Sequence, residues 1–322
     1  MTALRRLSIL SLVLGVGHVV FGAIVRITGS GMGCGDHWPK CLGHWFPPLD
    51  RPDLVIEISH RWFAATLSLA IVTLLVTALL RRRTPGVSGR GGVLRAASLA
   101  TVLVVAAALF GAATVKMELS NKLVIVTHLA IAMALLAVLI SSAMRAGGLG
   151  ASHASIGTAS EKTWRSARVA LVMTFVVLVL GAFTAHLPGA NSACTGFPLC
   201  RGSLIPDSTQ HVQFTHRIVA FLLFFHLLGV AIAVRRRGES RLIIRTAALT
   251  FGAVLAQIII AAALVEMQLP PLFRSLHQAV GTLVWVAVVV LALLSRRGAL
   301  GVGVPAAVVA PRPTLRAAEV AT

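Results

Sequence analysis

The chain has 322 residues, of which 57% are hydrophobic and only 12% are charged, and its formal net charge is +19. Soluble globular domains carry charges on about a quarter of their residues, so this composition excludes an ordinary soluble protein. The positive charge alone would suggest a nucleic-acid-binding protein, but its distribution along the chain argues against a site for polyanions.

Eight apolar stretches follow one another along the chain. A hydrocarbon core about 30 Å thick requires roughly 20 apolar residues per helix, and these stretches are too many and too long for the core helices of a soluble protein. The sequence therefore predicts an all-α integral membrane protein with eight transmembrane helices. They are expected at about residues 7–27, 57–80, 93–115, 121–144, 166–187, 210–234, 242–265 and 272–295.

Most basic residues lie on one side of the predicted membrane. An even number of spans places both termini on that side, and of the ten acidic residues only Glu161, Glu239 and Glu319 share it. Because Lys and Arg are enriched in cytoplasmic loops, we expect a multi-pass protein of the cell membrane with cytoplasmic N- and C-termini. The charge thus reports topology, and no nucleic-acid partner is expected.

The second half of the sequence repeats the first. His60-Arg61 recurs as His216-Arg217, His128 recurs as His277, and a cysteine pair precedes each His-Arg. Four helices separate equivalent positions, so the halves share one orientation, and we predict two pseudo-twofold-related four-helix bundles. Their expected bounds are residues 1–145 and 166–297, joined by a cytoplasmic linker over 146–165 and followed by a disordered cytoplasmic tail over 298–322.

Four histidines lie at matching depths in the predicted bundles. His60 and His216 lie near the outer ends of the second and sixth helices, and His128 and His277 lie about two turns inside the outer ends of the fourth and eighth. Ionisable side chains in a membrane are costly and mark functional sites, and two facing imidazoles in a bundle can hold haem iron. Zinc binding and hydrogen bonding to neighbouring helices are the alternatives.

An acidic residue accompanies only one of the two histidine pairs. Glu57 precedes His60 by three residues and shares its helix face, whereas the corresponding Gln213 is neutral. This difference predicts a chemical site in the N-terminal half and an electron-transfer site in the C-terminal half, unless Glu57 merely forms an ion pair with Arg61. Arg61 and Arg217 are candidates for hydrogen bonds to haem propionates, or for positions at the lipid headgroups.

All four cysteines lie in two predicted outer loops, as the pairs Cys34/Cys41 and Cys194/Cys200. The extracytoplasmic face is oxidising, so each pair is expected to form a structural disulfide that closes a small loop. A redox-active role for Cys34–Cys41 is the alternative, because exposed or strained disulfides are the ones that are easily reduced.

Taken together, these features resemble the haem A synthases of bacteria. The features are eight spans in two repeats, Glu-x-x-His-Arg on the second helix, His-Arg on the sixth, single histidines on the fourth and eighth, and cysteine pairs in the first and third outer loops. The likeness covers residues 1–297. It implies an enzyme that oxidises the C8 methyl group of haem O to a formyl group through a hydroxymethyl intermediate, with haem b as its cofactor.

The resemblance also implies roles for single residues. It assigns His60 and His128 to the substrate haem, Glu57 to catalysis, His216 and His277 to the iron of haem b, and Cys34–Cys41 and Cys194–Cys200 to disulfides. The expected partners are haem O, the enzyme that produces it, an electron acceptor and the lipid bilayer. A non-catalytic diheme b-type electron carrier is the alternative from a different class, although two electron-transfer sites would need no carboxylate at only one of them.

Overall fold

The computed structural model describes residues 1–150, 159–200 and 210–300, which fold as eight long α-helices and one short 3-10 helix. Each of the eight is long and apolar enough to cross a membrane, so the predicted all-α membrane fold is confirmed. The helices are α1 (Thr2–Ile27), α2 (Pro52–Leu80), α3 (Val93–Lys116), α4 (Lys122–Arg145), α5 (Glu161–His186), α6 (His211–Arg236), α7 (Arg241–Glu266) and α8 (Pro271–Ala299), and the 3-10 helix η1 is Ser30–Met32.

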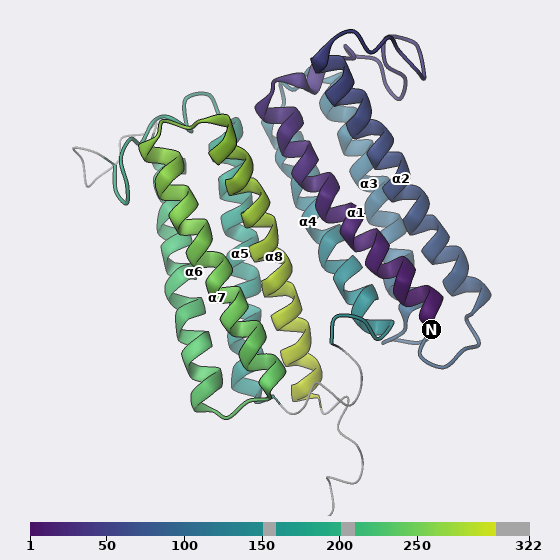
Figure 1. Cartoon of the computed structure of the whole chain (residues 1–322), viewed down its shortest axis with the longest axis vertical. Coiled ribbons are helices and arrows are strands. Elements are labelled where there is room, and N and C mark those ends of the chain that lie inside the picture. The colour runs from purple at the N-terminus through teal and green to yellow at the C-terminus, as the bar shows by residue number, and fades with distance from the viewer. Residues whose placement is uncertain (151–158, 201–209, 301–322) are drawn as a thin grey trace, which may run out of the picture.

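Figure 1 shows two four-helix bundles side by side, α1–α4 and α5–α8. Helix pairs that pack together in the first bundle, such as α3 with α4, have counterparts in the second, such as α7 with α8. The bundles meet through the contacts α1–α8, α4–α5 and α4–α8. Exchanging the two halves turns the first of these contacts into the second, which is the arrangement that a pseudo-twofold axis between two repeats produces.

Trp285 on α8 joins the two bundles from the inside. Its indole Nε1 donates a buried hydrogen bond of 2.9 Å to the backbone carbonyl of Met133 on α4, and its ring packs against Phe175 of α5 with the centroids 5.8 Å apart. Leu136 of α4 and Val289 of α8 belong to the same buried apolar cluster. Because the indole N–H has a partner, burying this large ring leaves no unpaired polar group. A packed core therefore sets the relative position of the two halves.

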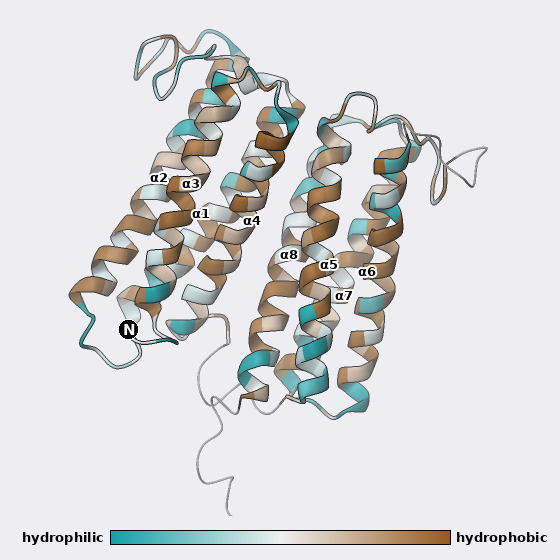
Figure 2. Ribbon diagram, turned by 180° about the vertical axis from the view of Figure 1, so that it is seen from behind, coloured by the Kyte–Doolittle hydropathy of each residue, from teal (hydrophilic) through white to brown (hydrophobic). Residues whose placement is uncertain are grey.

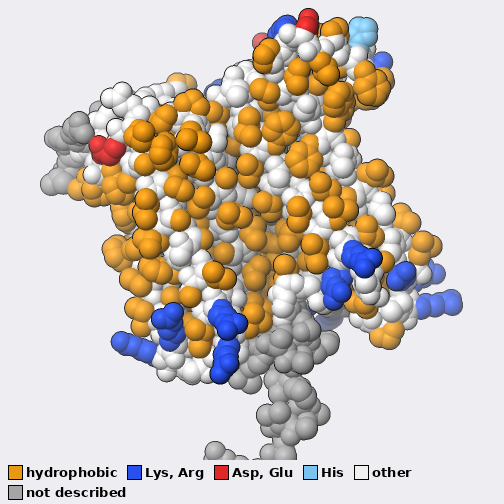
Figure 3. Space-filling view, in the orientation of Figure 1, with side chains coloured by type: hydrophobic (Ala, Val, Ile, Leu, Met, Phe, Trp, Pro, Cys, Tyr) orange, Lys and Arg blue, Asp and Glu red, His pale blue; other side chains and the backbone are white. Residues whose placement is uncertain are grey.

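Figure 2 shows that the helices are largely apolar along their length, and Figure 3 shows that hydrophobic side chains cover most of the molecular face in view. Leu69, Val102 and Leu249 are exposed by 67%, 63% and 73%, and lipid tails, unlike water, solvate such a surface. Figure 3 also shows Lys and Arg side chains near the end of the bundles at which the N-terminus lies in Figure 1. That this end faces the cytoplasm stays a prediction of the positive-inside rule.

Some helices extend beyond the apolar stretches that predicted them. α2 begins at Pro52 rather than near residue 57, and α5 begins at Glu161, inside the expected linker. Proline at the first helical position has the backbone angle that a helix requires, and Ser160 caps α5 by accepting a hydrogen bond of 3.2 Å from the backbone N–H of Thr163. Hydropathy indicates the part of a helix that lies in lipid, whereas capping residues determine where the helix begins.

The expected linker and tail lie partly outside the described residues. Residues 151–158 of the linker and residues 301–322 of the tail are not among them. α8 continues to Ala299, so the first residues of the expected tail are helical.

Glu239, in the turn between α6 and α7, connects that turn to the start of α5. Its carboxylate accepts hydrogen bonds from the backbone N–H of Ser160 (3.1 Å), the Ser160 hydroxyl (2.6 Å) and the Thr163 hydroxyl (2.5 Å). Burial raises the pKa of Glu239, but the hydrogen bonds from Ser160 and Thr163 outweigh burial and hold this pKa below its ordinary value of 4.5. The ionised carboxylate therefore connects the α6–α7 turn to the first turn of α5 at this end of the C-terminal bundle.

Glu239→Gln is expected to destabilise the protein by about 2 kcal/mol near neutral pH, because hydrogen bonds to a charged group contribute more than neutral ones. Since the folded-state pKa of Glu239 is lowered, its contribution is present above pH 4.5 and is lost as the pH falls through the folded value. Thermal unfolding in detergent at neutral and at acidic pH measures both effects. Glu161→Gln, in an exposed pair with Arg165, is the control, and an equal loss in the two variants would contradict the prediction.

Candidate functional site

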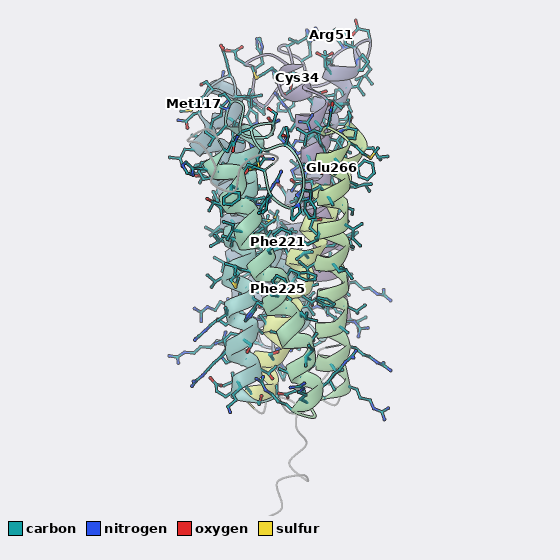
Figure 4. All side chains as sticks on the ribbon, turned by 90° about the vertical axis from the view of Figure 1, so that its left-hand side faces the viewer. Cys34, Arg51, Met117, Phe221, Phe225 and Glu266 are labelled. Carbon is teal, nitrogen blue, oxygen red and sulfur yellow. A yellow bond between two sulfur atoms is a disulfide. The ribbon has the colours of Figure 1, made fainter. Side chains whose placement is uncertain are left out.

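The connections α1–α2 and α5–α6 lie at the same end of the two bundles, which we call the loop end; Cys34 and Glu266 mark it in Figure 4. A side chain of the following helix holds each connection. Glu57 Oε2 accepts a hydrogen bond of 2.7 Å from the backbone N–H of Cys34, and Gln213 Oε1 accepts one of 2.7 Å from the N–H of Cys194. Both side chains are buried, so the repeat preserves this contact although one residue is an acid and the other an amide.

Arg61 also holds the first connection, which differs from its expected role. Its Nη1 donates hydrogen bonds of 2.7 Å to the backbone carbonyls of His37 and Lys40, and its Nη2 donates to Glu57 Oε1. The ion pair between Glu57 and Arg61 is therefore present in the structure. This guanidinium faces the loop between Cys34 and Cys41 and uses its donors there.

Arg217 has the same role in the second half. Its Nη1 donates a hydrogen bond of 2.7 Å to the carbonyl of Gly196, and its Nη2 donates one of 2.7 Å to the carbonyl of Cys194. Whether an arginine directly after the histidine reaches a haem propionate therefore stays a prediction for both halves, and the observed partners are backbone carbonyls.

Both expected disulfides, Cys34–Cys41 and Cys194–Cys200, are formed. All four cysteines are buried, and the first pair packs against Leu54 of α2. Buried disulfides are the ones that resist exchange with thiols. Their burial therefore favours a structural role over a redox-active one.

His128 and His216 are oriented in the same way, each by the preceding helix of its bundle. The Nδ1 of His128 lies 2.9 Å from the carbonyl oxygen of Ala107, and the Nδ1 of His216 lies 3.1 Å from that of Val177. A carbonyl oxygen only accepts, so each Nδ1 carries the proton and each Nε2 keeps a lone pair with which to bind a metal. Gly181 permits the approach, because a Cβ at this position would lie 3.0 Å from the ring of His216.

His277 contacts a side chain instead of a carbonyl. The amide Nε2 of Gln257 on α7 donates a hydrogen bond of 2.9 Å to the backbone carbonyl of His277 and lies 3.0 Å from its Nδ1. The Oε1 of Gln257 is buried and has no hydrogen-bond partner among the described residues. An unpaired buried oxygen costs free energy, so this amide is the group at the site with unused hydrogen-bonding capacity.

His60 packs on a third histidine that the sequence pattern did not reveal. Its ring stacks on that of His18 of α1 with the centroids 4.2 Å apart and the planes 16° apart. The two rings and His128 lie close enough to interact electrostatically. The buried Nδ1 of His18 has no hydrogen-bond partner within the described ranges. The sequence did contain a signal for His18, because it is an ionisable residue inside an apolar helix. It lies four residues before Gly22, which contacts His60.

His216 and His277 line one cavity in the C-terminal bundle. The volume of this cavity is about 220 Å³. Leu129 of α4, the neighbour of His128, lies in the same wall, so the first half contributes to the cavity of the second. Phe221 of α6, labelled in Figure 4, also lines it. The structure thus brings the predicted C-terminal pair together around a space, and it brings His60 and His128 together with His18.

The fold and its repeated histidine pairs define a duplicated, multi-pass membrane protein. The sequence profile of the COX15-CtaA family, described as cytochrome oxidase assembly protein, matches residues 5–289. The chain therefore belongs to this family, and the resemblance noted in the sequence is confirmed.

Similar proteins named "Heme A synthase" occur in several bacteria. The one from Alkalihalophilus pseudofirmus is 29% identical over 262 residues, which cover 79% of this chain and 86% of that protein. The one from Symbiobacterium thermophilum is 31% identical over 269 residues, covering 80% and 84%. The one from Shouchella clausii is 30% identical over 263 residues, covering 79% and 84%. The similarity thus extends over most of both chains.

Arg217→Gln is expected to loosen the connection between Cys194 and Cys200, because it removes charge-assisted hydrogen bonds to two carbonyls. Hydrogen exchange of the loop amides, followed by mass spectrometry, should become about tenfold faster or more, since the lost hydrogen bonds contribute at least about 1.5 kcal/mol. Arg51→Gln, at an exposed arginine paired with Asp53, is the control. Unchanged exchange in the Arg217 variant would show that the loop holds its shape without the guanidinium.

Proposed function

We propose that this protein is a haem A synthase, which oxidises the C8 methyl group of haem O to a formyl group through a hydroxymethyl intermediate. Membership of the cytochrome oxidase assembly family and the relatives named heme A synthase support the proposal. The single structural observation that carries it is the repetition, in each bundle, of two imidazoles on the second and fourth helices near the loop end.

Haem b is the cofactor that we assign to the C-terminal cavity, where His216 and His277 would hold its iron. Both residues line the cavity, and the hydrogen bond from His216 Nδ1 to Val177 leaves Nε2 available for iron. An iron-bound His277 would need an acceptor for its Nδ1–H, and the unpaired Oε1 of Gln257 fits this need after a rotation of its amide. Bound there, haem b supplies one-electron transfer.

The substrate haem is assigned to the N-terminal bundle, between His60 and His128. Both carboxylate oxygens of Glu57 already accept hydrogen bonds, one from Cys34 and one from Arg61. The role that we assign to this carboxylate is to stabilise positive charge that develops at the methyl carbon as electrons are removed. Gln213 at the equivalent position carries no charge, which is consistent with electron transfer alone in the second half.

The proposal includes the orientation in the membrane. We assign the loop end, with its disulfides, to the oxidising extracytoplasmic face, and the basic end to the cytoplasm. The reaction also requires an enzyme that delivers haem O, a source of the oxygen atom that the methyl group gains, and an acceptor that takes up the electrons.

The purified protein, supplied with haem O and an electron acceptor, is expected to yield hydroxymethyl and formyl haems, detected by liquid chromatography and mass spectrometry. Glu57→Gln should retain both haems but lose about 100-fold or more in product formation, the typical cost of removing a preorganised charge. The variant keeps an acceptor for Cys34, since Gln213 serves Cys194 in this way. Asp53→Asn, in the first turn of α2 and paired with Arg51, is the control. Absence of both products with wild-type protein would refute the synthase assignment.

His18 has no counterpart in the C-terminal half. Gly22 and Gly181 each pack against the histidine of the next helix, and counting back four residues from each gives His18 in α1 and Val177 in α5. His60, moreover, is the one predicted ligand whose ring makes no hydrogen bond to another described residue. The stacked His18 therefore orients His60 in place of a hydrogen bond.

His18→Val, which gives the first half the residue of the second, is expected to release the ring of His60. Electron paramagnetic resonance should then show a shifted low-spin signal from the N-terminal haem and an unchanged signal from the C-terminal haem, which serves as the internal reference. His18→Phe preserves an aromatic face and should shift the signal less. Two unchanged signals in His18→Val would contradict the orienting role.

A further inference from the structure

Two arginines line the C-terminal cavity in addition to its histidines. Arg26 lies in the last turn of α1 and Arg274 in the first turn of α8, so one belongs to each half of the molecule. Both lie in the wall that also contains His216 and His277. The C-terminal cavity is therefore completed by a cation from the N-terminal half.

The two guanidinium groups form no ion pair with a carboxylate of the residues that the structure describes. The two arginines lie close enough to repel each other. Like charges at the edge of a membrane-embedded cavity are unfavourable unless something neutralises them. The cavity wall is thus built for a ligand that carries negative charge.

The position of Arg274 relative to His277 suggests which part of a ligand it meets. The two residues are three apart on α8, so they share a helix face, with Arg274 about one turn closer to the loop end. Arg217, by contrast, already donates to the carbonyls of Cys194 and Gly196. Among the arginines that line the cavity, those with donors left for a ligand are Arg26 and Arg274.

The N-terminal histidine site has no equivalent of this pair of cations. With His128 and His277 in register, Ile125 takes the place of Arg274, and with Gly22 and Gly181 in register, Ala185 takes the place of Arg26. Neither replacement can bind an anion. The cationic pair is therefore a second chemical difference between the halves, independent of Glu57 and Gln213.

We propose that Arg26 and Arg274 bind the propionate carboxylates of the porphyrin in the C-terminal cavity and thereby retain it. This inference rests on the proposed assignment of haem b to that cavity. Arginine and carboxylate form strong, charge-assisted hydrogen bonds that are strongest away from water. The C-terminal cavity, which has the cationic pair, holds its haem permanently as a cofactor, whereas the N-terminal site, which has no such pair, releases its haem as product.

The test compares ferric haem b with its dimethyl ester, in which the propionates carry no charge. Protein produced in haem-depleted cells is titrated in detergent, and bis-imidazole absorption is recorded. His128→Ala serves as the common background, so that the bis-imidazole signal comes only from the C-terminal site; the same protein with His277→Ala is the blank. The background protein is expected to bind haem b about tenfold or more tightly than the ester.

Arg26→Gln combined with Arg274→Gln should reduce this preference to less than about twofold, mainly by weakening the binding of haem b. Arg26→Lys with Arg274→Lys retains the charge and should keep part of the preference, which also shows that the fold tolerates changes at both positions. Arg245→Gln, an exposed arginine of α7, is the matched control for charge.

The possible results separate the inference from the proposed function. An equal affinity for haem b and its ester in the background protein, or an undiminished preference in the double glutamine variant, would overturn the role of the two arginines. Failure of the background protein to give a bis-imidazole spectrum with either porphyrin would instead refute the haem site of the proposed function.

Discussion

The hydrogen bond between a histidine Nδ1 and a backbone carbonyl of the neighbouring helix orients the imidazole rings of His128 and His216. Inside a membrane a helix has no free N–H groups to offer, but carbonyl oxygens can accept a second hydrogen bond, as those of Ala107 and Val177 do. The bond selects the tautomer and leaves Nε2 with its lone pair. The helices approach closely enough only where the neighbour is small, which explains Gly111 and Gly181 beside these rings.

Duplication of a four-helix bundle provides two histidine pairs, and a few substitutions make them unlike. The Nδ1–carbonyl bond lies at His128, on the fourth helix of the first half, and at His216, on the second helix of the second half. Glu57 faces the loop of Cys34 where Gln213 faces that of Cys194, and both accept the same hydrogen bond, so the substitution changes charge without changing the backbone. When two repeats keep the same contacts to the backbone, single substitutions can change the charge of one site without changing its fold. In the proposed function, the acid of the first half therefore acts in the reaction, in addition to its ion pair with Arg61.

The fold was predictable from the sequence because hydropathy, the histidine spacing and the cysteine pairs all repeat along the chain. The partners of Arg61 were not, because they depend on the path of the loop between Cys34 and Cys41, which has no periodicity. The stack of His18 on His60 depends on how α1 is rotated about its axis. A helix that is apolar on all sides carries no hydrophobic stripe that would reveal this rotation, so only the three-dimensional arrangement brings the two rings together.

The interface between the bundles also belongs to both sites. His128 lies with His60 in the N-terminal group, and the next residue, Leu129, lines the C-terminal cavity. On α1, Gly22 contacts His60, and Arg26 one turn later lines the same cavity. On α4 adjacent residues, and on α1 adjacent turns, thus contribute to both sites, so the two sites are separated only by packed protein. In the proposed function, an electron that leaves the N-terminal site crosses this interface, which contains the packed core around Trp285.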